Sequence, residues 1–496
     1  MKLNPPSKLE NYKYDQLAAS RSSMLSRVFG WLSLISFVTA VCFIIFLQEK
    51  KLIILSLCVG FVHIKTNNLI IQKVSDITMS PKKTIQNNSV YRSLNGSPAE
   101  NIRKVIELMG GIDSFINQDD IVIIKPNAQW WSHGATNLLA IQTLIEIIMN
   151  RKEGFSGEIV LGENCHRGPQ PWMSSQSAWA GVFKRNSDIS GIINLNGLTT
   201  DLKQRYGNQF TVGHWLDTDA GGRQLTGADQ SPGYVYCNGK SSNPLFACEN
   251  DVTGDKHRAT IMTYPIFTTD NDTIVDLKNG CSTQGRLSQH KLKWINFSAL
   301  NHHSPYCGVT AVIKNIYGVV DLSGGADPAV HGILDPPYYN FHAFAFNEWQ
   351  AGPQPGMAGR AVGTFMKTIR KPDLNIISAE WVGLASRIDL PAAFTNTVLA
   401  SRNPVALDYH AVKHILYPNS RIRFHDQDNA NNALFHDLHE CTNAISCMSF
   451  KEHITISYDF KSNQIQENSP LDIVGKMIVG KSIKGLLKYS LYRLSN

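Results

Sequence analysis

The segment 121–161 constrains the fold more than any other part of the chain. It begins with the apolar run Ile121–Ile124, which is followed by a polar loop at 125–136. Apolar residues then recur at helical spacing through 137–150, and a second apolar strand pattern follows at Glu158–Leu161. This order predicts a βαβ unit, in which a helix joins two parallel strands. We therefore expect an α/β fold with a mostly parallel, Rossmann-like sheet and helices on both faces.

Further segments within 98–470 fit the same fold class. Pro98 is expected to open a helix of about 98–109, which two glycines end. The other predicted strands are 259–266, 274–277, 293–297, 374–378 and 396–400, and the other predicted helices are 308–317 and 404–416. Residues from about 200 to 258 are rich in Gly, Asp, Asn and Ser, which predicts an irregular insertion. We thus expect 98–470 to form one α/β domain.

An uncharged apolar stretch at 28–47 is long enough to cross a bilayer as a transmembrane helix. No small-residue cleavage site follows it, so we expect an anchor and not a removed signal peptide. A second apolar segment at 52–71 either completes a helical hairpin or lies in the membrane interface. The predicted membrane anchor is therefore 1–71, and the polar residues 72–97 are expected to link it to the domain.

The basic residues near the membrane predict its orientation. In a hairpin, Arg27 and Lys65 lie on one side of the membrane, and only Lys50 and Lys51 lie on the other. Because basic residues favour the inner side, the hairpin places the folded domain on the cytoplasmic face. A single crossing would place the domain outside.

The formal net charge of +7 is concentrated at the two ends of the chain. Residues 1–27 contain five basic and two acidic residues, and residues 471–496 contain five basic and one acidic residue. A nucleic-acid partner is not expected, because such proteins carry a basic face on the folded domain. Membrane lipids are the expected partners. The tail 471–496 alternates lysines with apolar residues, so it is either an interfacial helix or a helix packed on the core.

Polar and titratable residues follow the predicted strands. Ligands of parallel α/β sheets bind beyond the carboxyl ends of the strands, so these residues are the candidate site. Generic turn residues do not account for such a concentration of titratable groups. The set consists of Lys125, Asn127, Glu163, Asn164, His166, His303, Lys314, Asn315, Glu380 and Asp408.

The chemistry of these side chains suggests their roles. Glu163, His303 and Lys314 are the candidate catalytic residues, because they can transfer protons or act as nucleophiles. The candidate substrate-binding residues are Lys125, Asn127, Asn164, His166, Asn315 and Glu380. A divalent metal is the candidate cofactor, and its candidate ligands are Glu163, His166, His303 and Asp408. Acid–base catalysis without a metal remains an alternative, and so does a structural pairing of Glu163 with a lysine.

Several common signatures do not occur in the sequence. There is no GxGxxG, HExxH or GxSxG motif, so the usual dinucleotide-binding, metalloprotease and hydrolase sites are not predicted. The nine cysteines include no CxxC pair, so neither a zinc site nor an iron–sulfur site is predicted.

Five segments resemble the domain-of-unknown-function 362 family. They are IVIIKPN, EIVLGEN, HHSPYCGVTAVIKNIYGVV, KPDLNIISAEWVG and VLASRNPVALDYHAVKHIL. They follow one another from about Ile121 to Leu416, and His303 fits the family histidine, although the gap to Thr310 is a residue longer than usual. The resemblance implies an α/β fold with its site at these motifs, but no reaction. Some members carry cysteine-rich ferredoxin-like segments, which this chain lacks.

Two principal functions follow as hypotheses. The first is a membrane-anchored enzyme that acts on a small anionic or lipid-linked substrate near the inner leaflet. The second is a non-catalytic scaffold or accessory subunit of a membrane protein complex. A third hypothesis is a racemase that uses a metal cofactor, because the spacing of His303 and Lys314 before a glycine turn is similar to that in nickel-pincer lactate racemases.

Overall fold

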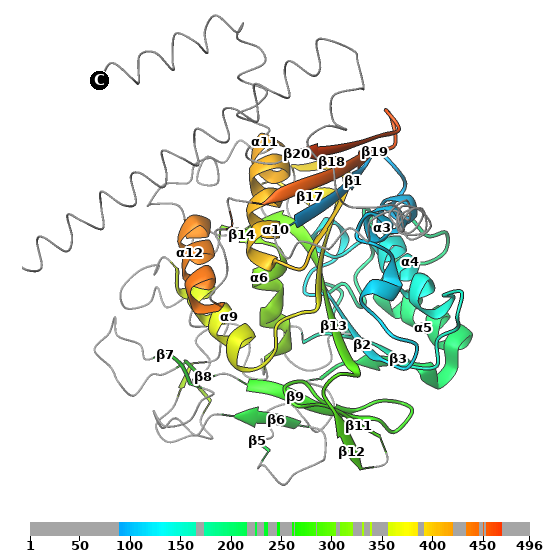
Figure 1. Cartoon of the computed structure of the whole chain (residues 1–496), viewed down its shortest axis with the longest axis vertical. Helices are drawn as coiled ribbons and strands as arrows, with labels where there is room; N and C mark the ends of the chain where they lie inside the picture. Colours follow the sequence, from blue (N-terminus) through cyan, green and yellow to red (C-terminus); the bar gives the residue numbers. More distant parts are fainter. Residues whose placement is uncertain are drawn as a thin grey trace, which may run out of the picture. The chain divides into compact units, whose positions relative to one another are not determined.

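The predicted α/β class is confirmed by the computed structural model, in which helices pack around a large mixed sheet (Figure 1). All described residues belong to one unit of the chain, Lys83–Asn496. The structure describes residues 89–164, 173–215, 224–225, 233–236, 246–248, 260–261, 263–283, 285–303, 308–320, 330–331, 338–339, 356–384, 391–419, 433–445, 450 and 453–468.

Ten of the described strands form the central sheet. Along it they are ordered β20-β19-β1-β18-β17-β13-β2-β3-β4, and β14 pairs with the end of β13. Their bounds are β1 Ser89–Leu94, β2 Ile121–Pro126, β3 Glu158–Gly162, β4 Phe210–Gly213, β13 Leu292–His302, β14 Val309–Thr310, β17 Leu374–Gly383, β18 Ala392–Ser401, β19 Ile454–Asp459 and β20 Gln464–Asn468.

The order in which the chain adds strands to the sheet reverses between β2 and β13. From β2 it proceeds to β3 and β4 on one side, and it later returns to β13 and β17 on the other. These five strands are all parallel, while β18 runs antiparallel to β17. In open α/β sheets, the crevice at such a switch point is where ligands bind.

Helices cover both faces of the sheet. The α-helices are α3 Pro98–Leu108, α4 Leu138–Met149, α5 Leu195–Tyr206, α6 Val312–Asn315, α9 Met357–Thr368, α10 Pro404–Ala411, α11 Tyr417–Asn419 and α12 Ala433–Ile445. The 3-10 turns are η1 Ile112–Ser114, η2 Ser132–Gly134, η4 Gly207–Gln209 and η5 Ile316–Val319, and η6 Val412–Leu416 is a π-helical turn.

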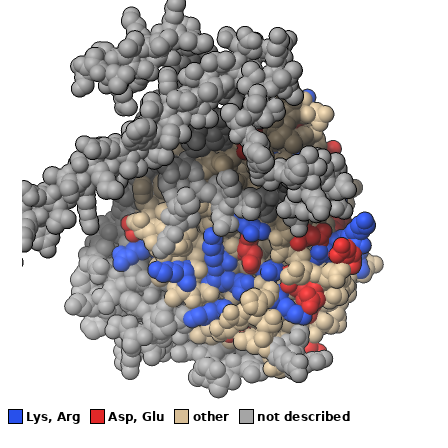
Figure 2. Space-filling model, viewed as in Figure 1, with Lys and Arg blue, Asp and Glu red and all other residues tan. Residues whose placement is uncertain are grey.

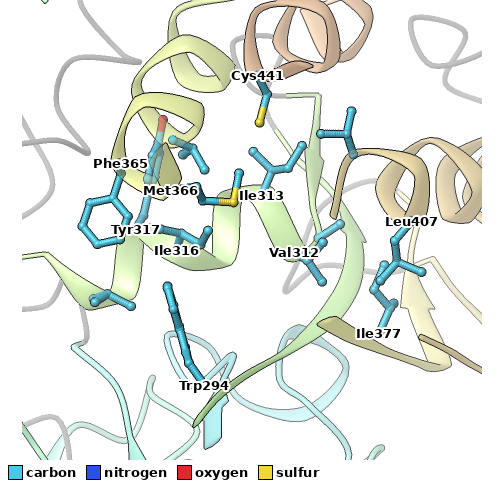
Figure 3. Packing of buried hydrophobic residues seen from close by; sticks show 14 of the residues in the cluster. Trp294, Val312, Ile313, Ile316, Tyr317, Phe365, Met366, Ile377, Leu407 and Cys441 are labelled. Carbon is cyan, nitrogen blue, oxygen red and sulfur yellow. The ribbon is translucent and has the colours of Figure 1, made fainter. Parts of the chain in front are cut away.

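Alternation along each strand divides the core into two layers. In β2, Val122 and Ile124 pack on the layer of α3, α4 and α5. Ile121 and Ile123 pack on the opposite layer, which contains α6, α9, α10 and α12. Figure 3 shows this second layer, where Trp294 of β13 lies below the helices that carry Ile316 and Phe365. Because successive side chains of a strand point to opposite faces, this pattern also fixes the face on which each polar residue lies.

Side-chain caps explain where several helices begin. Ser97 and Glu100 form a reciprocal capping box at the start of α3. Asn137 accepts a hydrogen bond from the backbone of Ala140 at the start of α4. Asn403 does the same for α10, where Pro404 takes the first helical position. Asp408 of the candidate set lies within α10, in the helix that the Asn403 cap begins.

Two smaller sheets lie beside the central one. Among the described residues, one has the order β12-β11-β10-β9-β6-β5 and the other the order β15-β16-β8-β7. Their strands are β5 Gln224–Leu225, β6 Gly233–Tyr236, β7 Phe246–Cys248, β8 Thr260–Ile261, β9 Thr263–Thr268, β10 Ile274–Asp276, β11 Gly280–Thr283, β12 Arg286–Ser288, β15 Val330–His331 and β16 Tyr338–Tyr339. The predicted insertion at about 200–258 therefore begins later than expected, because 200–213 contains the end of α5 and strand β4 of the central sheet.

The end of the predicted linker, 72–97, requires a correction. Residues 89–94 form β1, which lies inside the central sheet between β18 and β19. Its sequence, SVYRSL, looks polar, but Ser89 and Ser93 are buried, and the Ser93 hydroxyl donates a hydrogen bond to Asn101. Hydrogen bonding to neighbouring elements thus lets polar residues occupy a central strand.

Two predicted helices also differ from those observed. The segment predicted as a helix at 308–317 consists of β14, α6 and η5. The segment predicted at 404–416 begins as α10 but continues as the π-helical turn η6. π-Helical turns are often found at functional sites, and such a local widening is not visible in hydrophobic periodicity.

The membrane predictions concern residues that the structure does not describe. The anchor at 1–71, including 28–47 and 52–71, and the tail at 471–496 lie outside the described residues. Within the described ranges, none of the helices has the length and apolar character that a bilayer crossing requires. On the face in view, the described part of the surface carries Lys and Arg interspersed with Asp and Glu (Figure 2).

Candidate functional site

Lys125 is the buried cation at the centre of the candidate site. It lies near the end of β2, its side chain is 0% exposed, and alternation places it on the α6 side of the sheet. Its Nζ donates to the Asn315 Oδ1 at 2.7 Å and to the Pro126 carbonyl at 2.9 Å. It also lies 3.3 Å from the Glu163 Oε1. An ammonium has three hydrogens, so this geometry gives each of them an acceptor.

Glu163 follows directly after β3 and completes the ion pair. Its Oε2 accepts a hydrogen bond from the Ala128 backbone at 2.5 Å, and the residue is buried. Burial raises the pKa of Glu163 to about 7, although Lys125 and the Ala128 N–H both oppose the rise. A carboxyl group with such a pKa exchanges its proton readily at neutral pH, which is what a general acid or base requires.

Asn315 connects the ion pair to the next strand. Its Nδ2 donates to the Asn296 Oδ1 at 2.7 Å and to the Lys125 carbonyl at 3.3 Å. Asn296, which lies in β13, donates in turn to the Val312 carbonyl at 2.8 Å. The two asparagines therefore join α6 to β2 and β13, the two strands at the switch point. These bonds also hold the Asn315 Oδ1 in place, which accepts from the Lys125 ammonium.

Asp408 fixes the start of α6 from a different helix. It lies in α10, and its two carboxylate oxygens accept hydrogen bonds from the backbones of Val312 and Ile313, each at 2.9 Å. Burial raises the pKa of Asp408 to about 7, while these two N–H groups oppose the rise. Both oxygens thus serve α6, whose own cap residue, Ala311, has no side chain that can accept.

The loop after β3 is joined to η5 on the other side of the ion pair. The Asn164 backbone donates to the Gly318 carbonyl at 2.8 Å, and its Nδ2 donates to the Val320 carbonyl at 2.7 Å. A Cβ on Gly318 would lie 2.7 Å from the Lys125 Nζ and 2.8 Å from the Glu163 Oε1. Only a glycine lets the backbone approach the buried pair this closely.

Replacing Gly318 by alanine is therefore expected to lower the free energy of unfolding by about 1–3 kcal/mol, because overpacking displaces groups that are held by hydrogen bonds. Urea-induced unfolding followed by tryptophan fluorescence measures the change. Gly197→Ala in the first turn of α5 is the matched control. Its new Cβ would find no atom closer than 3.5 Å, so that variant should be neutral or slightly stabilised. An unchanged Gly318→Ala variant would contradict the close packing.

Glu380 lies on the opposite face of the sheet from Lys125. It is 0% exposed and lies where the register of β17 shifts against both β13 and β18. Its Oε2 accepts a hydrogen bond from Ser378, whose hydroxyl accepts one from the Asn137 backbone at 3.0 Å. Its Oε1 has no partner among the described residues. Burial raises the pKa of Glu380 to about 8, and the charge of Asp188 adds to the rise.

The remaining candidates are placed less directly against the ion pair. Asn127 is buried, and its backbone donates to the Thr136 hydroxyl at 2.8 Å. The Lys314 Nζ lies 4.5 Å from the centre of the Tyr317 ring. His303 is buried beyond the end of β13, and its backbone donates to the Gly308 carbonyl at 3.0 Å. His166 lies outside the described residues.

The structure thus brings together part of the predicted set. Hydrogen bonds and the ion pair link Lys125, Glu163 and Asn315, and Asp408 is connected to them through α6. Sequence reasoning missed Asn296 and Gly318. A signal for Asn296 was present, because it is a polar residue between the apolar residues Ile295 and Phe297 of a predicted strand. Gly318 carried no comparable signal. Its close approach to Lys125 and Glu163 depends on the packing of three separate segments of the chain.

The predicted metal site finds no support in the described part of the chain. No group of three or more His, Cys, Asp or Glu side chains there is arranged to hold a metal ion. The two oxygens of Asp408 serve backbone N–H groups, and those of Glu163 face Lys125 and Ala128. The geometry instead suits proton transfer beside a fixed positive charge.

Comparisons with known proteins add no relative. No protein-family model, curated protein or solved structure matches the chain. The resemblance to the domain-of-unknown-function 362 family therefore stays a prediction, and the function must be argued from the site alone.

Proposed function

We propose that the protein is an enzyme that performs general acid–base catalysis on a small anionic substrate, with Glu163 as the group that carries the proton. The buried pair of Lys125 and Glu163 at the carboxyl ends of β2 and β3 is the single observation that carries this proposal. These ends lie beside the switch point between β2 and β13, which is the usual ligand site of such sheets.

The distribution of hydrogen bonds assigns different roles to the two residues. Each hydrogen of the Lys125 ammonium has an acceptor, so the lysine serves as a fixed positive charge and not as a nucleophile. The raised pKa of Glu163, about 7, allows it both to accept and to donate a proton at neutral pH. When Glu163 takes up a proton, the pair carries a net positive charge, which favours an anionic group on the substrate.

A scaffold without catalytic activity is the alternative, and a proton-exchange experiment separates the two. The full chain is incubated in D₂O with a panel of short-chain carboxylic acids and phosphate monoesters. Proton NMR then records binding and the incorporation of deuterium at carbon. An enzyme whose general base removes a proton from carbon incorporates deuterium into the bound compound, even when its overall reaction is not known.

Glu163→Gln is expected to lower the rate of deuterium incorporation by about 10²–10⁴-fold, because this is the usual contribution of a general acid or base. Binding of the same compound should change little, since the amide keeps the shape of the side chain. Lys203→Met is the matched control, because Lys203 forms an exposed ion pair with Asp270 away from the site. The proposal fails if Glu163→Gln exchanges protons as fast as the wild type, and a chain that binds no compound in the panel would favour the scaffold.

A further inference from the structure

A buried pair of histidines joins α10 to the segment that leads into β19. The His410 Nδ1 lies 3.0 Å from the His453 Nε2, and the His453 Nδ1 lies 3.0 Å from the Phe450 carbonyl oxygen. The two residues are only 4% and 7% exposed. None of these groups belongs to the candidate site around Lys125, so the pair requires a separate explanation.

The Phe450 carbonyl determines which nitrogen of a neutral His453 ring carries the hydrogen. A carbonyl oxygen only accepts, so the His453 Nδ1 must carry a hydrogen. In a neutral ring the His453 Nε2 then accepts, and the His410 Nδ1 must be the donor. The His410 Nε2 is consequently bare, and it has no hydrogen-bond partner among the described residues. Two neutral imidazoles therefore satisfy the observed contacts, and the His410 Nδ1 also lies 3.3 Å from the Thr455 hydroxyl oxygen.

The surroundings oppose any further proton. Burial lowers the pKa of His410 well below its ordinary value, and repulsion from His414, His453 and Arg92 adds to the effect. Burial also lowers the pKa of His453. Among the residues that the structure describes, the titratable or charged groups that face the pair are Arg92 on β1, Tyr409 on α10, Lys413 and His414 in η6, and, beyond Phe450, His439 on α12.

Two carboxylates of the described residues near the pair have other partners. Asp408 precedes His410 on α10, but its two oxygens accept from the backbone of α6. Asp459, at the end of β19, interacts with Arg92 and with the Asn95 amide at 2.8 Å. A proton added to either histidine would thus create a buried cation beside Arg92, and this costs free energy.

We propose that His410 and His453 form a pH-sensitive latch, which holds the β19–β20 hairpin against β1 and α10 when both rings are neutral and releases the hairpin when they are protonated. The hairpin lies at the edge of the central sheet, where β19 pairs with β1 and β20 pairs with β19 alone among the described strands (Figure 1). Its release would therefore leave the other strands of the sheet paired.

The direction in which pH changes the docking of the hairpin follows from the lowered pKa values of the two histidines. When the hairpin is undocked, both histidines regain a pKa near the ordinary 6.5. Docking is then at full strength above pH 6.5 and weakens as the pH falls below this value, because the undocked state binds more protons. Asp459 does not titrate in this range, since its pKa lies below the ordinary 3.8. Between about pH 7.5 and about pH 5.5, His410 should raise the undocked population about tenfold, and His453 should raise it further.

Hydrogen–deuterium exchange of the full chain tests the latch. Protection factors, corrected for the intrinsic effect of pH on exchange, are compared for β19 and for the central strands β2 and β3. We expect the protection of β19 to fall by more than about tenfold, and by up to about 100-fold, between about pH 7.5 and about pH 5.5, because both histidines contribute. The protection of β2 and β3 should not follow this fall.

His410→Gln combined with His453→Gln should make the protection of β19 insensitive to pH in this range. His290→Gln is the matched control, because His290 is an exposed histidine outside the cluster. The latch is overturned if wild-type β19 loses no more protection than β2. If the double variant does not fold, carbon NMR of labelled histidine in the wild type replaces it, and two buried rings that titrate near 6.5 would equally overturn the proposal.

Discussion

Replacing Lys125 by methionine is expected to lower the free energy of unfolding by about 3–5 kcal/mol at neutral pH, which is the usual cost of removing one partner from a buried ion pair. The substitution leaves three acceptors without their donor: the Glu163 carboxylate, the Asn315 amide oxygen and the Pro126 carbonyl. Glu163 can lessen the cost by taking up a proton. The loss should therefore grow as the pH rises above about 7, because the wild-type carboxylate then ionises beside Lys125, while the variant must either keep the proton or bury an unpaired charge.

Urea-induced unfolding at several pH values measures this effect. Lys203→Met, which breaks the exposed pair with Asp270, is the matched control and should cost less than about 1 kcal/mol. Lys125→Met combined with Glu163→Leu should cost less than the sum of the two single changes, because the double variant buries no unpaired charge. A cost below about 1 kcal/mol for Lys125→Met would show that the ion pair does not hold the strand ends together.

The free energy of unfolding of the wild type is expected to fall as the pH rises. Glu380→Gln should show a much smaller fall. The pKa of Glu380 is about 8 in the folded protein and 4.5 in the ordinary state, so the folded protein binds the extra proton between these values. The associated stability is fully present below about pH 4.5 and is lost as the pH rises towards 8. The shift corresponds to about 3–5 kcal/mol. Glutamine remains neutral and lacks this dependence.

The measurement is the difference in unfolding free energy between wild type and variant across this pH range. Glu163 and Asp408 also have raised pKa values, so the wild type declines for three reasons, and only the difference isolates Glu380. Glu107→Gln on the surface of α3 is the matched control, because Glu107 forms an exposed pair with Lys104. If the wild type and Glu380→Gln declined in parallel, Glu380 would not be the buried neutral acid that the structure indicates.

Hydrophobic periodicity was sufficient to predict the centre of the fold. The βαβ unit at 121–161 is present as β2, α4 and β3, because its apolar runs are long and both strands are buried on two faces. Strand β1 escaped prediction, since its serines and Arg92 are stabilised by partners on other elements. Strands β19 and β20 were missed as well. They pair at the edge of the sheet, where a strand needs little apolar surface on one of its faces, so the apolar pattern is weak.

The candidate site could be predicted only as a set of strand ends. Lys125 and Glu163 follow strands that neighbour each other, so their proximity follows from the parallel order. The sequence could not show that Asn315 and Gly318 would enclose the pair, because α6 and η5 replace the longer helix that periodicity predicts. It also could not show that Glu380 would lie on the opposite face, because that depends on strand register.

The sequence by itself determined the fold class and the edge of the sheet where titratable residues gather. Both depend on local patterns, namely the period of apolar residues and the residue types at strand ends. The tertiary structure alone decided that Lys125 and Glu163 form an ion pair and that Asp408 caps α6, and it alone paired His410 with His453. The physical reason is that these contacts join residues far apart in the chain, and burial at the contact shifts their pKa values.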